Sequence, residues 1–260
     1  MTKDTATPLD ENTRRYYLDV MGIQCWQSLD SQQVSDAGAD PIVEHGNRGE
    51  GNSIESNSID SNRDVAAVSW TQLEESIHQC DKCVLHKTRK QALVGRGNQS
   101  AELMFVVLSP SARDDGNGII CSDAVNDLFS KMLAAIDINI DDVYISSLLK
   151  CAVPANHTIS PKEIRSCDDH LKQQIQLIRP RLLVVLGETA VRCLLQKNLS
   201  IDDFRAMNPG LGNLGQQYLF ESIPVFISYS PEELLQQVED KRKAWSDLQQ
   251  LQKIINDSSQ

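Results

Sequence analysis

Four short apolar runs, separated by stretches with helical periodicity, constrain the fold of this chain more than any other feature. The runs are residues 102–108, 143–149, 182–187 and 224–230, and each predicts a buried strand. Helical stretches lie at 70–79, 123–136, 161–178, 188–196 and 239–255. Ser160, Pro161 and Glu163 form a favourable helix start, because Ser caps the amide ends and Pro suits the first turn. This alternation predicts an α/β fold with three αβα layers and a central parallel sheet.

The sequence outside this pattern divides into two further regions. Residues 1–29 form a first region, whose segment 13–29 is short, apolar and aromatic. Residues 30–68 are rich in Ser, Asn, Asp, Gly and Glu, so they bury too little apolar surface to offset the entropy of ordering. We therefore expect an N-terminal partner-binding arm (1–29), a disordered acidic linker (30–68) and a folded domain (69–260).

Charge and hydropathy narrow the function classes. The 260 residues carry a formal net charge of −11. Strong DNA binding usually needs a basic excess to neutralise phosphates, so we expect any DNA binding to be weak or indirect. No apolar run is long enough to span a membrane, and the first residues lack a secretory pattern. We expect a soluble cytoplasmic protein whose cysteines are reduced or bind metal.

Four cysteines stand in marked positions. Cys80 and Cys83 have CxxC spacing, Cys151 follows a predicted strand, and Cys167 lies on the helix that starts at Pro161. Four thiolates suit either zinc or an iron–sulfur cluster. The alternative is that they are buried as small apolar residues, as we expect for the other three cysteines.

Several of these stretches resemble family 4 uracil-DNA glycosylases. The similarity covers residues 73–250 and is carried by "CDKCVLHKTRKQALVGRGN", "AELMFVV", "KMLAAIDINIDDVYISSLLKCAVPANHTISPKEIRSC" and "LIRPRLLVVLGETAVRCLL". The resemblance implies a uracil-DNA-glycosylase-like fold. It also implies a structural 4Fe–4S cluster bound by Cys80, Cys83, Cys151 and Cys167, in preference to zinc.

The same resemblance locates a base pocket whose chemical groups have changed. Leu108 stands where the family has a water-orienting carboxylate, and Ile120 where it has a stacking ring. Ser147 replaces an amide that reads uracil, and Ser230 replaces a histidine. The degenerate positions are Leu108, Ser109, Pro110, Ile120, Ser147 and Ser230. Base excision needs stacking, edge recognition and charge stabilisation, so we expect no catalysis.

Two acids leave the enzymatic alternative open. Asp114 and Asp115 follow the first changed motif and could substitute for the lost carboxylate, although paired acids after a strand more often form a solvated turn. The competing hypothesis is therefore an active or specificity-shifted uracil-DNA glycosylase in base excision repair.

The arm supplies a second resemblance. The stretch "RRYYLDVMGIQCW" resembles the N-terminal peptide of the psi subunit of bacterial DNA polymerase III, which tethers an inactive glycosylase-like domain to the clamp-loader complex. The expected partner-binding residues are Arg14, Arg15, Tyr17, Leu18, Met21, Gly22, Ile23 and Trp26. A short amphipathic arm on a flexible linker suits docking of a helix into a groove. The resemblance implies a replisome adaptor whose partner is the clamp loader, while the alternative is that the arm packs on its own domain.

Overall fold

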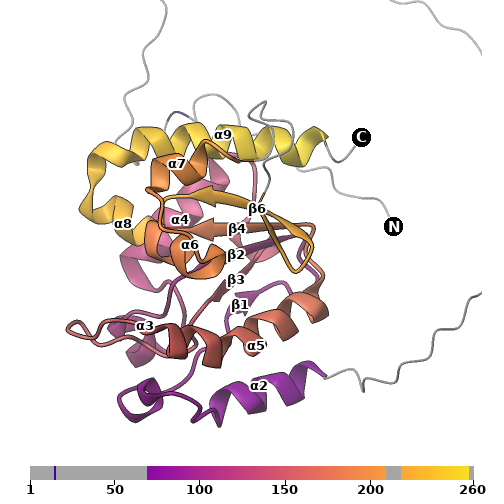
Figure 1. Ribbon diagram of the computed structural model, residues 1–260. Coiled ribbons are helices and arrows are strands. Elements are labelled where there is room, and N and C mark those ends of the chain that lie inside the picture. Colours follow the sequence, from indigo (N-terminus) through magenta and orange to yellow (C-terminus); the bar gives the residue numbers. More distant parts are fainter. Residues whose placement is uncertain (1–14, 16–68, 209–217, 258–260) are drawn as a thin grey trace, which may run out of the picture. The chain divides into compact units, whose positions relative to one another are not determined.

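A six-stranded sheet forms the centre of the molecule (Figure 1). The computed structural model describes residues 15, 69–208 and 218–257. The strand order is β1-β3-β2-β4-β6-β5. The strands are β1 (Arg96–Gly97), β2 (Leu103–Val107), β3 (Tyr144–Ser147), β4 (Leu182–Leu186), β5 (Leu219–Phe220) and β6 (Ile223–Ser228). All four predicted strands are present, and β2, β3 and β4 are buried along their whole length.

The predicted parallel sheet is right for the four central strands and wrong at both edges. Strands β3, β2, β4 and β6 are parallel, with Val106 paired to Ser146 and to Val185. At one edge β1 runs antiparallel to β3. At the other, β5 and β6 form a hairpin through Glu221 and Ser222, both with positive φ, the backbone that a tight hairpin turn requires. Two-residue strands such as β1 and β5 leave too short a pattern to detect in sequence.

Helices cover both faces of the sheet and give the expected three layers (Figure 1). The connections from β2 to β3 and from β3 to β4 run in opposite directions along the sheet, so right-handed crossovers place α4 and α5 on opposite faces. Helix α4 contacts α8 and α9, whereas α5 contacts α2. The α-helices are α2 (Trp70–His78), α3 (Ala112–Asn117), α4 (Asp123–Ala134), α5 (Pro161–Ile178), α6 (Glu188–Leu195), α7 (Ile201–Arg205), α8 (Pro231–Gln236) and α9 (Lys241–Asp257).

The start of α5 confirms the capping prediction. The Ser160 side chain accepts a hydrogen bond from the Glu163 amide, the Glu163 carboxylate accepts one from the Ser160 amide, and Pro161 occupies the first turn. Helices α3, α7 and α8 were not predicted, because each has five or six residues and too few turns for a periodic signal.

Most of the expected arm and all of the expected linker lie outside the described residues. Of the arm residues, the structure describes Arg15 alone, in helical conformation and partly buried. The arm and linker predictions therefore stay predictions. Within the described ranges, no helix is both long and apolar enough to cross a membrane.

Candidate functional site

A pocket of about 180 Å³ opens at the carboxyl ends of β2, β4 and β6. Its walls include Val107 and Leu108 from the end of β2, Leu186 and Gly187 from the end of β4, and the turn after β6. Ligands of open α/β sheets bind at this edge, where neighbouring strands connect in opposite directions. The fold therefore defines a class of α/β protein with a pocket at the switch point of its sheet.

Some of the predicted pocket residues line this cavity. Leu108, Ser109, Asp114 and Ser230 are part of its wall. Leu108 is half-buried and packs against the main core, so it supplies an apolar surface there. The Ser230 hydroxyl accepts a hydrogen bond from the Glu233 amide and so begins α8. These hydroxyl and aliphatic groups give the pocket neither an imidazole nor an aromatic face at the predicted positions.

The other predicted residues lie outside the set that lines the cavity. Pro110 is buried beside it, and Ile120 is 1% exposed and belongs to the hydrophobic core. Ser147 is fully buried at the end of β3, and its hydroxyl has no hydrogen-bond partner among the described residues. Alignment to the family motifs located these residues near the pocket, but it did not show which side chains point into it.

The acids Asp114 and Asp115 are buried in the first turn of α3, which corrects the expectation of a solvated turn. Asp114 accepts hydrogen bonds from the amides of Ser111 (2.9 Å) and Ser122 (2.8 Å). Asp115 accepts from the amides of Lys90 (2.8 Å) and Gln91 (3.0 Å) and lies outside the pocket. Both carboxylates are therefore engaged in holding backbone.

Two acids that sequence reasoning missed also line the pocket. Glu233 accepts hydrogen bonds from the amides of Ser230 (2.9 Å) and Glu188 (3.2 Å), so it joins the starts of α8 and α6. Glu232 lies on the pocket wall with an exposed side chain. Desolvation, then the charges of Asp114 and Glu233, raise the pKa of Glu232. Their position directly after a predicted parallel strand was the available signal, because ligand sites gather at such ends.

Cys121 also lines the pocket, whereas its neighbour Ile120 does not. It is 5% exposed with φ of 53°, a left-handed backbone that a non-glycine residue seldom adopts. Burial, followed by the charge of Asp114, raises the pKa of the Cys121 thiol to about 12. The thiol is thus a protonated apolar surface near neutral pH and not a nucleophile.

The four predicted cysteines lie together at the end of the sheet nearest α2 and α5. Cys80 follows α2, Cys83 caps the short helix Val84–Lys87, Cys151 follows β3, and Cys167 lies in the second turn of α5. Cys151 and Cys167 are buried with Leu85 and Leu149, and Cys83 packs against this group. All four thiols are free. Within the described part of the chain, no three His, Cys, Asp or Glu side chains are placed tightly enough for a single metal ion.

Hydrogen-bond donors surround these sulfurs. Arg89 donates from Nη1 to the Cys151 Sγ (2.9 Å) and from Nη2 to the carbonyls of His78 and Cys80. Burial raises the pKa of Cys151, and the Arg89 bond and charge oppose this. Burial likewise raises the pKa of Cys167 to about 11, opposed by the backbone amide and charge of Lys150. The donors favour the thiolate forms that metal binding requires.

A buried polar network continues from the cysteines along α5. Lys150 is 1% exposed, and its ammonium donates to the Ser146 hydroxyl, the Ser147 carbonyl and the Gln174 side chain. Burial lowers the pKa of Lys150 to about 7. Sequence patterns did not indicate this network, because a lone lysine after a strand gives no sign of burial.

Comparison with known proteins identifies the class more closely. Residues 94–249 match the family model of the uracil DNA glycosylase superfamily, and the chain belongs to this superfamily. It is 38% identical over 124 residues to a type-4 uracil-DNA glycosylase of Archaeoglobus fulgidus, covering 48% of this chain and 62% of that protein. It is 33% identical over 138 residues to a type-4 uracil-DNA glycosylase of Thermotoga maritima, covering 53% and 71% respectively.

The chain thus spans less than two thirds of the first of these relatives, and 64% of a type-4 uracil-DNA glycosylase of Pyrobaculum aerophilum. The predicted fold and family are confirmed by the superfamily match and by the α/β sheet.

Proposed function

We propose that this protein is a superfamily member that has lost base excision, holds a 4Fe–4S cluster, and acts as an adaptor in DNA replication. The observation that carries the loss of excision is the pocket wall. Two acids on this wall, Asp114 and Glu233, each accept hydrogen bonds from two backbone amides, and the lining is aliphatic at Leu108 and Val125. A glycosylase must stack a flipped base and stabilise charge that develops on it, and these side chains supply neither function.

The cysteine site supports the cluster. Cys83, Cys151 and Cys167 belong to a partly apolar group with Leu85 and Leu149, and N–H donors reach the sulfurs of Cys151 and Cys167, which suits a thiolate-bound anion. Cys80, Cys83, Cys151 and Cys167 would hold the cluster, and its chemistry here is to link chain segments. Arg89 donates hydrogen bonds to the Cys80 carbonyl and the Cys151 sulfur, so it links two of the four cysteines.

Metal analysis tests the cluster directly. Protein purified without oxygen should be brown and contain about four iron and four sulfide per chain. A Cys193→Ala variant serves as the matched control, since Cys193 is half-buried on α6 and is not one of the four. Stoichiometric zinc without iron would contradict the cluster.

The adaptor role rests on the sequence of the arm. Residues 13–29 place Tyr17, Leu18, Met21 and Trp26 in a short apolar segment that a polar stretch of more than 30 residues separates from the folded domain. An apolar arm that is tethered at high effective concentration suits a partner groove. Because the arm resembles the psi peptide, we propose the clamp loader of the replicative polymerase as its partner.

Calorimetric titration of a purified bacterial clamp-loader complex with the full chain tests this role. Trp26→Ala should weaken binding by about 30-fold, or 2 kcal/mol, because a buried aromatic anchor often dominates such interfaces. Asp19→Ala, in the same segment, should change it little. Equal binding by the wild type and the Trp26→Ala variant would rule out the arm as the docking element.

One observation favours the alternative of residual glycosylase activity. Glu232 is an acid on the pocket wall that forms no hydrogen bond with the described residues, and Gln236 on the same wall offers an amide. These two side chains could in principle position water and read a base edge. Under this alternative, uracil release would be measurable in the wild type and lost in Glu232→Gln.

A further inference from the structure

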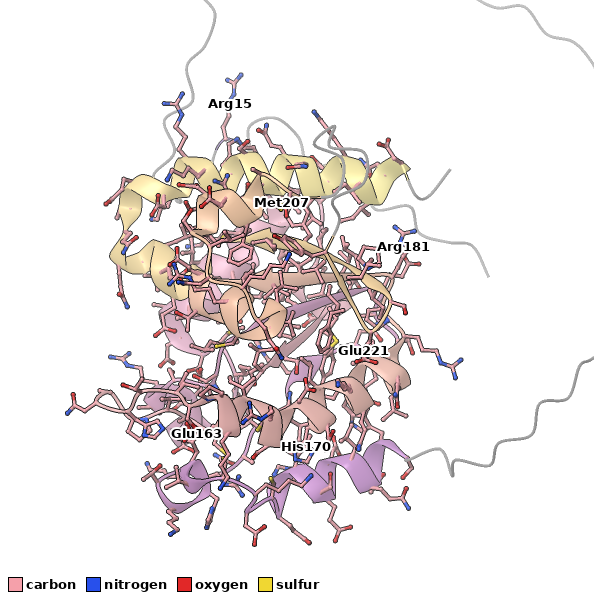
Figure 2. The ribbon with its side chains drawn as sticks, in the orientation of Figure 1. Arg15, Glu163, His170, Arg181, Met207 and Glu221 are labelled. Atoms are coloured by element: carbon pink, nitrogen blue, oxygen red, sulfur yellow. The ribbon has the colours of Figure 1, made fainter. Side chains whose placement is uncertain are left out.

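A buried histidine beside the cysteine site has no partner that the described residues can supply. His170 lies on α5, on the side that faces α2 (Figure 2), and it is 3% exposed. Neither Nδ1 nor Nε2 has a hydrogen-bond partner in the described part of the chain, cysteine sulfur included. An imidazole that is buried without a partner costs free energy, so native proteins seldom leave both nitrogens unsatisfied.

The position of His170 relative to the cysteines follows from the helix and from Lys150. Cys167, His170 and Gln174 are buried on α5 at spacings of three and four residues, so they share one face. Lys150 bridges the two ends of this face: its backbone amide bonds to Cys167 and its ammonium bonds to Gln174. His170 therefore lies one helical turn from Cys167, beside the segment that leads into Cys151.

Basic side chains lie near this helix face, and a bound anion would be stabilised by them. Arg89 and Lys150 both lie beside the cysteines, and the described residues offer neither of them a carboxylate. Lys82 is between Cys80 and Cys83, and its ion pair with Asp169 is long, at 3.8 Å, and exposed. Arg89, Lys150 and Lys82 thus lie on or beside the chain segments that carry the four cysteines, and the unbonded imidazole of His170 lies on the same helix face as Cys167. An iron–sulfur cluster with four thiolates carries net negative charge and exposes sulfur acceptors on every face.

We propose that His170 donates a hydrogen bond from its imidazole N–H to a sulfur atom of the cluster, and that this bond raises the reduction potential of the cluster. The inference rests on the cluster proposed above. Hydrogen bonds to sulfur stabilise the more negative, reduced state, so removing one makes reduction less favourable. His170 thereby becomes the residue that tunes the cluster, in addition to the four that bind it.

The test compares the full-length wild type with His170→Leu, His170→Gln and Leu171→Ala, all purified without oxygen. His170→Leu should keep the iron and sulfide content but lower the reduction potential. His170→Gln retains an N–H donor and should restore part of the shift. Leu171→Ala removes a buried side chain from the same turn without removing a donor, so its potential should match the wild type.

A second readout needs no variant and covers the case in which His170→Leu fails to hold its cluster. Pulsed electron paramagnetic resonance of wild-type protein with nitrogen-15-labelled histidine should show a coupling between the paramagnetic cluster and an imidazole nitrogen. A loaded cluster without this coupling, or with the same potential in His170→Leu, overturns the role of His170 alone. Wild-type protein that contains no iron overturns the cluster itself, so the two failures are distinguishable.

Discussion

Replacing Asp115 by alanine tests whether this acid, one of the pair after β2, stabilises the fold or instead orients a reacting water. The Asp115 side chain is 7% exposed and accepts hydrogen bonds from two backbone amides, Lys90 (2.8 Å) and Gln91 (3.0 Å). These bonds attach the segment after Cys83 to the start of α3. A hydrogen bond to a charged group contributes about 1.5–3 kcal/mol, and water can replace part of this at the exposed residues Lys90 and Gln91, so Asp115→Ala should lower the free energy of unfolding by about 2–4 kcal/mol. For a domain of this size that corresponds to a fall in Tm of roughly 5–12 °C.

Thermal and urea unfolding followed by circular dichroism measures this change. Asp127→Ala provides the matched control, because Asp127 is an exposed acid on α4 for which no ion pair is assigned. The control should alter the free energy of unfolding by less than about 0.5 kcal/mol. A variant at Asp115 that is as stable as the control would refute the assignment of this acid as a backbone clamp.

Three further outcomes follow from the same contacts. Although burial opposes it, hydrogen bonds from Ser160 and His157 lower the pKa of Glu163 below 4.5, so its stabilisation is complete above that pH and is lost as the pH falls through the lowered pKa. Glu163→Gln should therefore be less stable than the wild type at pH 7, and unfolding curves should converge on acidification. Asp247→Ala should cost about 3–5 kcal/mol in urea unfolding, because it leaves the guanidinium of Arg205, bonded at 2.6 and 2.7 Å, without its buried partner. Cys151→Ala should lose iron and lower the Tm, since the ligands bridge distant chain segments.

The strands and long helices were predictable because they carry continuous signals. Strands β2 and β4 are unbroken apolar runs, and α5 combines a capping box with a long amphipathic pattern. Strand β5 and helix α8 were not predicted, because with two and six residues they are too short for a periodic signal. Their formation depends on tertiary pairing with β6 and α4, which no local pattern records.

The candidate sites divide in the same way. The four cysteines were found from spacing and resemblance, and the structure packs three of them, Cys83, Cys151 and Cys167, around Leu85 and Leu149. The pocket was located from changed motifs, but Ile120 and Ser147 point into buried surroundings outside it. Glu232 and His170 were missed. Glu232 reaches the pocket because it follows the end of β6, and His170 is buried on a face of α5 against which Lys150 packs. Such settings arise from packing between segments far apart in sequence.

Single-turnover uracil release measures the central claim, which is that the pocket of this superfamily member no longer excises a base. Anaerobically purified protein with its iron quantified is incubated in excess over single- and double-stranded DNA containing one uracil, and abasic sites are cleaved and counted over time. The account predicts no release above a protein-free control, since Leu108 and Ser230 supply none of the groups that stabilise the departing base. Release by the wild type that disappears in Glu232→Gln would contradict the account and establish an active glycosylase.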